Sequence, residues 1–147
     1  MKINIQNKKA SFEYHLIDCY EAGLQLQGTE IKSIRQGKAS LHESYCFFKR
    51  SELFIKNLHI PEYKQGNIYN HEPKRTRKLL LHKRELKKLR DSMNTKGLTI
   101  IPKKLFISSS GYAKIEVCLA KGKKLFDKRE DLKKKAAKRE IDRNLKY

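Results

Sequence analysis

The chain has 147 residues, 38% of them hydrophobic, so its length suits one folded domain with a buried core and excludes a chain that is disordered throughout. Its 35 Lys and Arg against 16 Asp and Glu give a formal net charge of +19, which indicates a polyanionic partner and nucleic acid above all. A membrane surface fits less well, because basic helices that lie on membranes commonly carry Trp and this sequence has none.

Residues 1–120 predict mostly strands, because apolar and polar side chains alternate along several short segments. In chain order, the first expected strand begins at residue 12 and runs up to residue 21, and the others cover residues 24–27, 45–48, 53–55, 98–101, 105–107 and 113–119. We expect a turn at Ala22-Gly23 between the first two strands, and a hairpin that joins the third to the fourth.

Two helices are expected among these strands. The first begins at 28–30, where Glu30 would lie favourably in the first turn, and it ends at Gly37. The second covers 82–93, with Leu86, Leu89 and Met93 along one face. Short strands around one core, with helices at the ends, predict a mainly β protein: an OB-type antiparallel barrel with two or three short flanking helices. An open sheet is the alternative.

The last 27 residues differ from the rest in composition. Residues 121–147 carry twelve Lys and Arg against five Asp and Glu and contain few large apolar side chains. We therefore divide the chain into a barrel, 1–120, and a basic C-terminal tail, 121–147. Asp127 can cap a helix, but the Lys-rich segment 133–138 repels itself and little buries the apolar stripe. We expect a tail that is disordered when free and helical when RNA neutralises it.

The N-terminus and the cysteines indicate the compartment. No apolar segment typical of secretion begins the chain, and no run approaches the roughly 18 apolar residues of a membrane span, so we expect a cytoplasmic protein. Cys19, Cys46 and Cys118 are widely spaced and form no C-x-x-C motif. Since each lies in an expected strand, we expect buried free thiols and neither a zinc site nor a redox pair.

The strongest local signal is the basic run Lys74-Arg75-Thr76-Arg77-Lys78, placed between a proline and an apolar triplet. Guanidinium groups bind phosphate oxygens in pairs, and the flanking residues would hold them at the edge of the core. We expect Lys74, Arg75, Arg77 and Lys78 to contact RNA. A solvated charge run is the alternative interpretation.

A second basic segment, Lys121-Gly122-Lys123-Lys124, ends the last expected strand. Its glycine would let a ligand approach the backbone, and we expect the three lysines to contact RNA. No P-loop precedes it, because Val117 stands where that motif needs a glycine, so nucleotide hydrolysis is not supported.

Glu21 stands at the expected turn, in a basic surrounding. It either holds a Lys or Arg in place or accepts a hydrogen bond from a base edge or a ribose hydroxyl. The five His show no metal-ligand spacing, and no nucleophile–base pair or carboxylate cluster stands out. We therefore predict no catalytic residue, no metal and no cofactor. A general OB-type RNA binder and an RNA-processing nuclease remain the alternatives.

Several long motifs resemble one family. They are NKKA at 7–10, YEAGLQLQGTEIKSIRQGKA at 20–39, NLHIPEY at 57–63, NHEPKRTRKLLLHKRELKKL at 70–89, LTIIP at 98–102 and LAKGKKLFDKRED at 119–131. Together they are similar to the SsrA-binding proteins (small protein B). The resemblance implies an OB-type barrel that binds the tRNA-like domain of transfer-messenger RNA. It also implies delivery of that RNA to stalled ribosomes for trans-translation, which rescues the ribosome and tags the nascent chain without catalysis by this protein.

The resemblance also implies roles for single residues of the barrel. Glu21, Leu80 and His82 match positions at which the family binds RNA. Lys123 and Lys124 match a G-K-K string that lies close to the RNA in the family.

Three further residues, Asp127, Lys128 and Arg129, match the string that begins the functional tail. In the family this tail enters the vacant ribosomal decoding site and the mRNA channel, where it becomes helical. Phe126 precedes the string where some relatives carry His, so stacking on a base would survive here and an imidazole hydrogen bond would not. We expect a monomer that does not associate with membranes.

Overall fold

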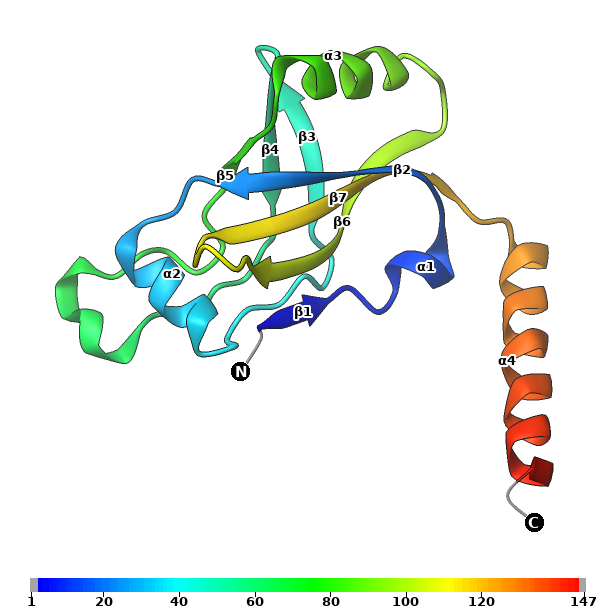
Figure 1. The fold of residues 1–147 in the computed structure, drawn as a ribbon. Coiled ribbons are helices and arrows are strands. Elements are labelled where there is room, and N and C mark those ends of the chain that lie inside the picture. Colours follow the sequence, from blue (N-terminus) through cyan, green and yellow to red (C-terminus); the bar gives the residue numbers. More distant parts are fainter. Residues whose placement is uncertain (1–2, 146–147) are drawn as a thin grey trace.

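The structure, a computed structural model, describes residues 3–145; the side chains of 67–68, 125–127 and 140–145 lie outside the description. In chain order the elements are β1 (Asn4–Gln6), α1 (Ala10–Glu13), β2 (Tyr14–Leu24), α2 (Gly28–Arg35), β3 (Tyr45–Lys49), β4 (Glu52–Lys56), the 3-10 helix η1 (Lys64–Tyr69), β5 (Arg77–Leu80), α3 (Lys83–Ser92), β6 (Leu98–Ile107), β7 (Ala113–Gly122) and α4 (Leu125–Leu145). Figure 1 shows the strands gathered into one body, from which α4 extends.

The strands form one antiparallel sheet that closes on itself. Their order is β1-β6-β3-β4-β5-β2-β7, and β7 pairs back onto β6, so the six strands from β6 to β7 make a ring with β1 added outside β6. The ring closes at a single register pair between β3 and β6, Cys46 with Ile100, whereas β6 and β7 pair along their length. The mainly β, OB-type antiparallel barrel predicted from the sequence is confirmed.

The core lies inside this ring and follows the period of two along β4 and the first half of β7. Leu53 and Ile55 of β4, Ile100 of β6, and Ile115 and Val117 of β7 are completely buried. Their neighbours on the same strands lie on the outer face. Apolar burial of this kind stabilises by about 25 cal/mol for each Å² removed from water, so these residues hold the barrel together.

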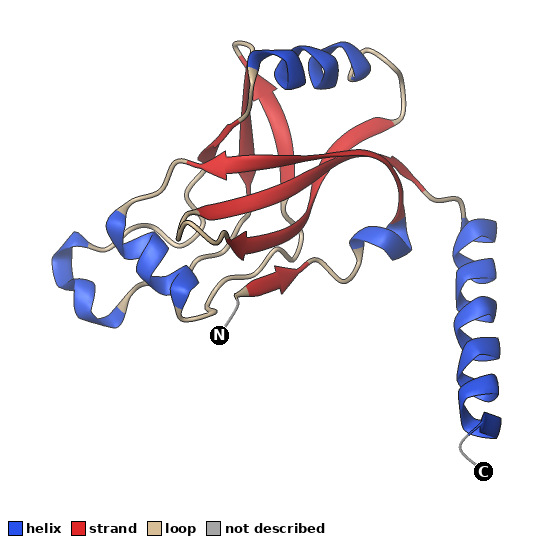
Figure 2. Ribbon diagram, in the orientation of Figure 1, coloured by secondary structure: helices blue, strands red, loops and turns tan. Residues whose placement is uncertain are grey.

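The two predicted helices are confirmed, and both cover the barrel (Figure 2). Helix α2 begins where the Glu30 carboxylate accepts a hydrogen bond from the Gln27 backbone N–H at 2.8 Å. It ends before Gly37, whose φ of +74° suits a residue without a side chain. Helix α3 buries Leu89 of the predicted apolar stripe.

Strand β2 corrects the expected turn at Ala22-Gly23. The strand runs without interruption through both residues, Phe12 belongs to α1, and no second strand follows at 24–27. Gly23 lies in the extended strand beside Leu80: a Cβ atom built at Gly23 would lie 3.4 Å from the Cβ of Leu80, at the limit of ordinary van der Waals contact. Glu21 therefore lies within a strand.

The cysteines depart in part from the prediction. Cys46 is a buried free thiol, as expected, and burial raises its pKa. Cys19 and Cys118 instead form a disulfide, so the prediction of free thiols was wrong for both. They are 99 residues apart in sequence but lie directly opposite one another on β2 and β7, a pairing that spacing alone does not reveal.

Most of the tail forms the 21-residue helix α4, while Lys121 and Gly122 still belong to β7. It leaves the barrel after β7 and extends away from it (Figure 1). Its described side-chain contacts with α1 include Lys135, whose ammonium lies 5.7 Å from the ring centre of Phe12. That this helix forms only with RNA stays a prediction. Within residues 3–145, no helix combines the length and the apolarity that crossing a bilayer requires.

Candidate nucleic-acid interface

Arg77 lies inside the protein, which corrects the expectation that it contacts RNA. Its side chain is fully buried and donates hydrogen bonds to the Glu30 carboxylate and, at 2.6 Å, to the Leu58 carbonyl. The reason is the alternation along β5: Arg77 and Leu79 point inward, whereas Lys78 and Leu80 are directed outward. Arg77 therefore anchors β5 and offers no surface to a phosphate.

Arg75 reaches the same carboxylate from the surface. Its Nη2 lies 2.6 Å from Glu30 Oε1, and its side chain is 31% exposed. Burial alone would raise the pKa of Glu30, but the hydrogen bonds from Arg75, from the Gln27 backbone and from Arg77 outweigh it, so the pKa of Glu30 is lowered. The ionised carboxylate thus joins α2 to the start of β5.

The two lysines of the basic run lie on the surface, as expected. Lys74 is exposed. Lys78 is partly exposed and lies 3.0 Å from the Glu52 carboxylate, a surface ion pair that a phosphate could replace at small cost.

Glu21 and Leu80 come together beside an open hollow. Glu21 is exposed on β2, and Gly23, on the same face two residues further on, pairs with Leu80 of β5 and with Lys114 of β7. Leu80 is 50% exposed. The hollow beside it has a volume of about 570 Å³ and is lined by Gly23, Leu24, Leu26, Gln27, Gly28, Ile31, Arg35, Leu80, Ser110, Gly111, Tyr112, Ala113 and Lys114.

This lining combines apolar surface, an aromatic ring and cations. Tyr112 is 69% exposed, and Arg35 and Lys114 add positive charge. An exposed ring can stack on a base while cations bind the adjoining phosphates. Sequence reasoning missed these three residues, because an exposed Tyr in a strand-rich sequence cannot be told from a core Tyr, and Arg35 and Lys114 are remote in sequence from the basic runs.

His82 lies just beyond the end of β5. Its ring is exposed, and its backbone N–H donates to Glu85 Oε1 at 3.1 Å, which fixes the start of α3. The exposed residues Lys83, Arg84, Lys87 and Lys88 then carry the basic surface along α3. His82 and Leu80 are thus placed at one end of the barrel, as two members of the predicted set.

The other predicted lysines lie at the opposite end of the β2–β7 ladder. Lys121 pairs in register with His15, and Lys124 is exposed. Lys123 differs: its side chain is only 9% exposed and forms an ion pair with Asp131 of α4, while its backbone N–H donates to the Glu13 carbonyl at 2.8 Å. The ion pair with Lys123 lowers the pKa of Asp131. Lys123 therefore links the first turns of α4 to the barrel.

The predicted residues therefore form two groups joined by β2. From His15 to Glu21 the strand spans six residues, roughly 20 Å at about 3.3 Å per residue. In the tail, Lys128 is partly exposed and Arg129 is exposed. Phe126 and Asp127 belong to α4, but their side chains lie outside the described residues.

A closed antiparallel barrel with a basic surface and a basic helical extension defines a small OB-type barrel protein. The family model described as "SmpB protein" matches residues 4–147. A protein of Phocaeicola vulgatus named SsrA-binding protein is 57% identical over 144 residues, which are 98% of this chain and 96% of the relative. One of Cytophaga hutchinsonii with the same name is 58% identical over 141 residues, 96% of this chain and 92% of the relative.

A solved structure described as "tmRNA-SmpB: a journey to the center of the bacterial ribosome" contains a chain similar to this one. The two share 41% identity with a TM-score of 0.72, over 88% of this chain and 94% of the other. The chain belongs to the SmpB family.

Proposed function

We propose that this chain binds the tRNA-like domain of transfer-messenger RNA and delivers it to stalled ribosomes, so that trans-translation rescues the ribosome and tags the nascent chain. One observation carries the proposal: the chain is similar, along 88% of its length, to a protein described with tmRNA on the bacterial ribosome. The net charge of +19 supports it, because a basic protein gains affinity for RNA through release of counterions.

The barrel, 1–120, would bind the folded RNA. Glu21, Leu80 and His82 lie at one end of the barrel, with Lys74 and Lys78 as surface cations on the segment before and along β5. Phosphate contacts position a protein on RNA, and splayed bases are read by stacking and by polar side chains. The hollow beside Leu80, with Tyr112 on its wall, suits one such base.

The tail, 121–147, would read the state of the ribosome. It is a basic helix that contacts α1 and extends away from the strands of the barrel, so it can enter a channel lined with RNA phosphates while the barrel holds its own RNA (Figure 2). An mRNA already in that channel would exclude the helix. Asp127, Lys128 and Arg129 begin the part that would enter the decoding site, whereas Lys121, Lys123 and Lys124 join it to the barrel.

In this proposal the protein acts in the cytoplasm, as a monomer and without catalysing a reaction. The work is done by binding: the barrel supplies affinity for one RNA, and the tail supplies selectivity for an empty channel. Membership of the SmpB family supports RNA binding without catalysis over the alternative function, an RNA-processing nuclease.

The test is a gel-shift titration at about 150 mM salt, where exposed charges are screened as they are in the cell. It compares the tRNA-like domain of transfer-messenger RNA with an ordinary alanine tRNA, under excess competitor RNA. We expect a preference of at least about tenfold, equivalent to 1.4 kcal/mol, with both RNAs left intact. Equal binding would favour a general RNA-binding barrel, and cleaved RNA a nuclease.

A further inference from the structure

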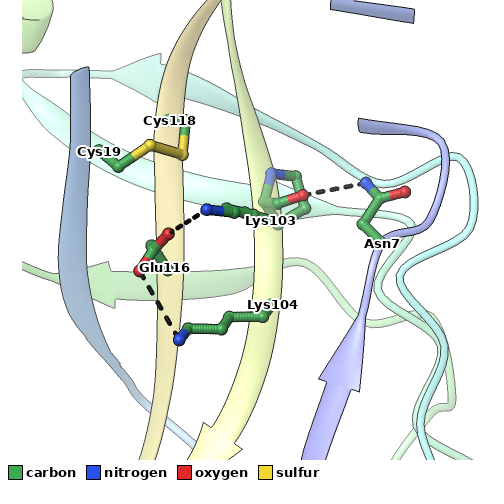
Figure 3. The surroundings of a disulfide bond; sticks show 7 residues. Asn7, Cys19, Lys103, Lys104, Glu116 and Cys118 are labelled. Carbon is green, nitrogen blue, oxygen red and sulfur yellow. Dashed lines mark hydrogen bonds and ion pairs between the residues drawn. A yellow bond between two sulfur atoms is a disulfide. The ribbon is translucent and has the colours of Figure 1, made fainter. Parts of the chain in front are cut away.

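Cys19 and Cys118 bridge two neighbouring strands of the barrel on its outer face (Figure 3). They are direct partners in the β2–β7 ladder, with Cα atoms 4.0 Å apart. Their exposure differs: Cys19 is exposed, whereas Cys118 is completely buried. A reagent in solution can therefore reach one sulfur and not the other.

The ladder keeps the two sulfurs opposite one another whether or not they are bonded. Register pairs flank them on both sides, Tyr20 with Val117 and Asp18 with Leu119. On its other side β7 is held by β6. Breaking the bond would therefore leave two thiols already in place to form it again, with no rearrangement of the backbone.

The charges around the pair suit thiol chemistry better than metal binding. A carboxylate oxygen of Glu116 and the two sulfurs lie within 4.8 Å of one another. Glu116 is engaged by Lys103 at 3.5 Å and by Lys104 at 4.0 Å, as Figure 3 shows. These ammonium groups offset the carboxylate that would oppose a thiolate, and they would have to leave before Glu116 could bind a cation.

We propose that Cys19 and Cys118 form a reversible redox site that exchanges with low-molecular-weight disulfides of the glutathione class. The exposed Cys19 thiolate attacks one sulfur of the small disulfide, whose S–S bond breaks and releases one small thiolate. Cys118 then attacks the Cys19 sulfur and releases the second small group, and the Cys118 proton passes to this departing thiolate. The two protein thiols lose two electrons and two protons, and the small disulfide becomes two thiols.

The bond would act on the part of the barrel that carries the candidate RNA contacts. The next row of the outer face, about 7 Å along the strands, pairs Glu21 with Glu116. The bond also joins residues 99 apart in sequence, which restricts the unfolded chain and stabilises the oxidised barrel. That the bond is broken and remade in the cell rests on the proposed function, since a ribosomal partner works in a reducing compartment.

The test uses the full-length protein, reduced, freed of reductant and placed in glutathione buffers of rising oxidised fraction. Remaining thiols are blocked with N-ethylmaleimide after denaturation and counted by intact mass. We expect the count to fall from three to one with a loss of about 2 Da in the unblocked protein, and reduced glutathione to reverse it. The Cys46→Ala variant is the matched control, and its count should fall from two to zero.

Two variants separate the roles of the two sulfurs. Cys118→Ser should accumulate a mixed disulfide with glutathione at Cys19, because nothing resolves it. Cys19→Ser should form its mixed disulfide at Cys118 at least about tenfold more slowly, since Cys118 is buried. Equal rates in the two variants, or a pair that stays reduced in oxidised glutathione, would overturn the proposal.

Protection of both thiols from oxidation by equimolar Zn²⁺ would also overturn the proposal, because it would indicate a metal site. None of these measurements involves RNA, so the redox site and the proposed function can fail independently.

Discussion

Arg77 of β5 and Glu30 of α2 form an ion pair in which both side chains are completely buried. Arg75 joins the same carboxylate at 2.6 Å from the surface side. The pair ties the helix to the strand that ends at Leu80, and α2 also supplies part of the wall of the hollow. Arg77 thus holds β5 and α2 together from inside the barrel, and these two elements carry Leu80 and part of the hollow on the surface.

We predict that Glu30→Gln lowers the free energy of unfolding by about 3–5 kcal/mol, because it leaves a buried guanidinium without its counter-charge. Urea denaturation measures the change. The matched control is Glu52→Gln, which removes the partner of Lys78 in a surface pair 49% and 34% exposed and should cost less than about 1 kcal/mol. Similar losses in the two variants would contradict a structural role for the buried pair.

Acid should weaken the protein through the same carboxylate. The pKa of Glu30 in the folded protein lies below its ordinary value of 4.5. Its contribution to stability is therefore complete above pH 4.5 and is lost as the pH falls through the folded pKa. Urea denaturation from pH 6 to pH 3 should show the natural protein losing stability more steeply than Glu30→Gln. Parallel curves would exclude Glu30 as the group responsible.

Local patterns were enough to predict much of the fold. The stripe of Leu86, Leu89 and Met93 predicted helix α3, and clean alternation over 113–119 predicted β7. These signals succeed because helix and strand periods are set by the backbone and by which face is buried.

The errors came from contacts between distant segments. The run 74–78 predicts one surface patch, but strand alternation and the distant Glu30 place Arg77 in the core. Gly23 predicts a turn, but its pairing with Lys114 of β7 keeps it within β2. Cys19 and Cys118 became partners only once the register of β2 and β7 was known. Each needs the tertiary structure, which local pattern does not contain.

Leu80 provides a sharp test of the hollow. We predict that Leu80→Ala weakens binding of the tRNA-like domain about fivefold, since burying part of an exposed leucine against RNA is worth about 1 kcal/mol. Ile17→Ala is the matched control, because Ile17 is 51% exposed against 50% for Leu80 and also lies on the strand system of the barrel. Thermal unfolding should show both variants folded. Equal weakening by the two substitutions would exclude a specific contact at the hollow.

The salt dependence of binding should separate Lys74 from Arg77. An exposed lysine that neutralises one phosphate contributes about 0.7–0.9 to the slope of log K against log salt, so Lys74→Ala should lower the slope by that amount. Arg77→Ala should lower the free energy of unfolding. The molecules that remain folded should show an unchanged slope of log K against log salt, because the Arg77 guanidinium is buried. A shallower slope for Arg77→Ala would return it to the set of phosphate contacts.

Removal of 125–147 should separate RNA binding from tagging. Among the α4 residues whose side chains the structure describes, 128–139, none belongs to the core, so the shortened barrel should fold; it retains Lys121, Lys123 and Lys124. We predict that its affinity for the tRNA-like domain stays within about threefold of the full chain, a change of less than 1 kcal/mol, while tagging in a reconstituted translation system is abolished. Asp131→Asn is the control: it breaks the ion pair with Lys123 but keeps the basic helix, and it should retain tagging. Loss of RNA binding together with tagging would mean that the tail forms part of the RNA site, and the division into a binding barrel and a probing tail would have to be abandoned.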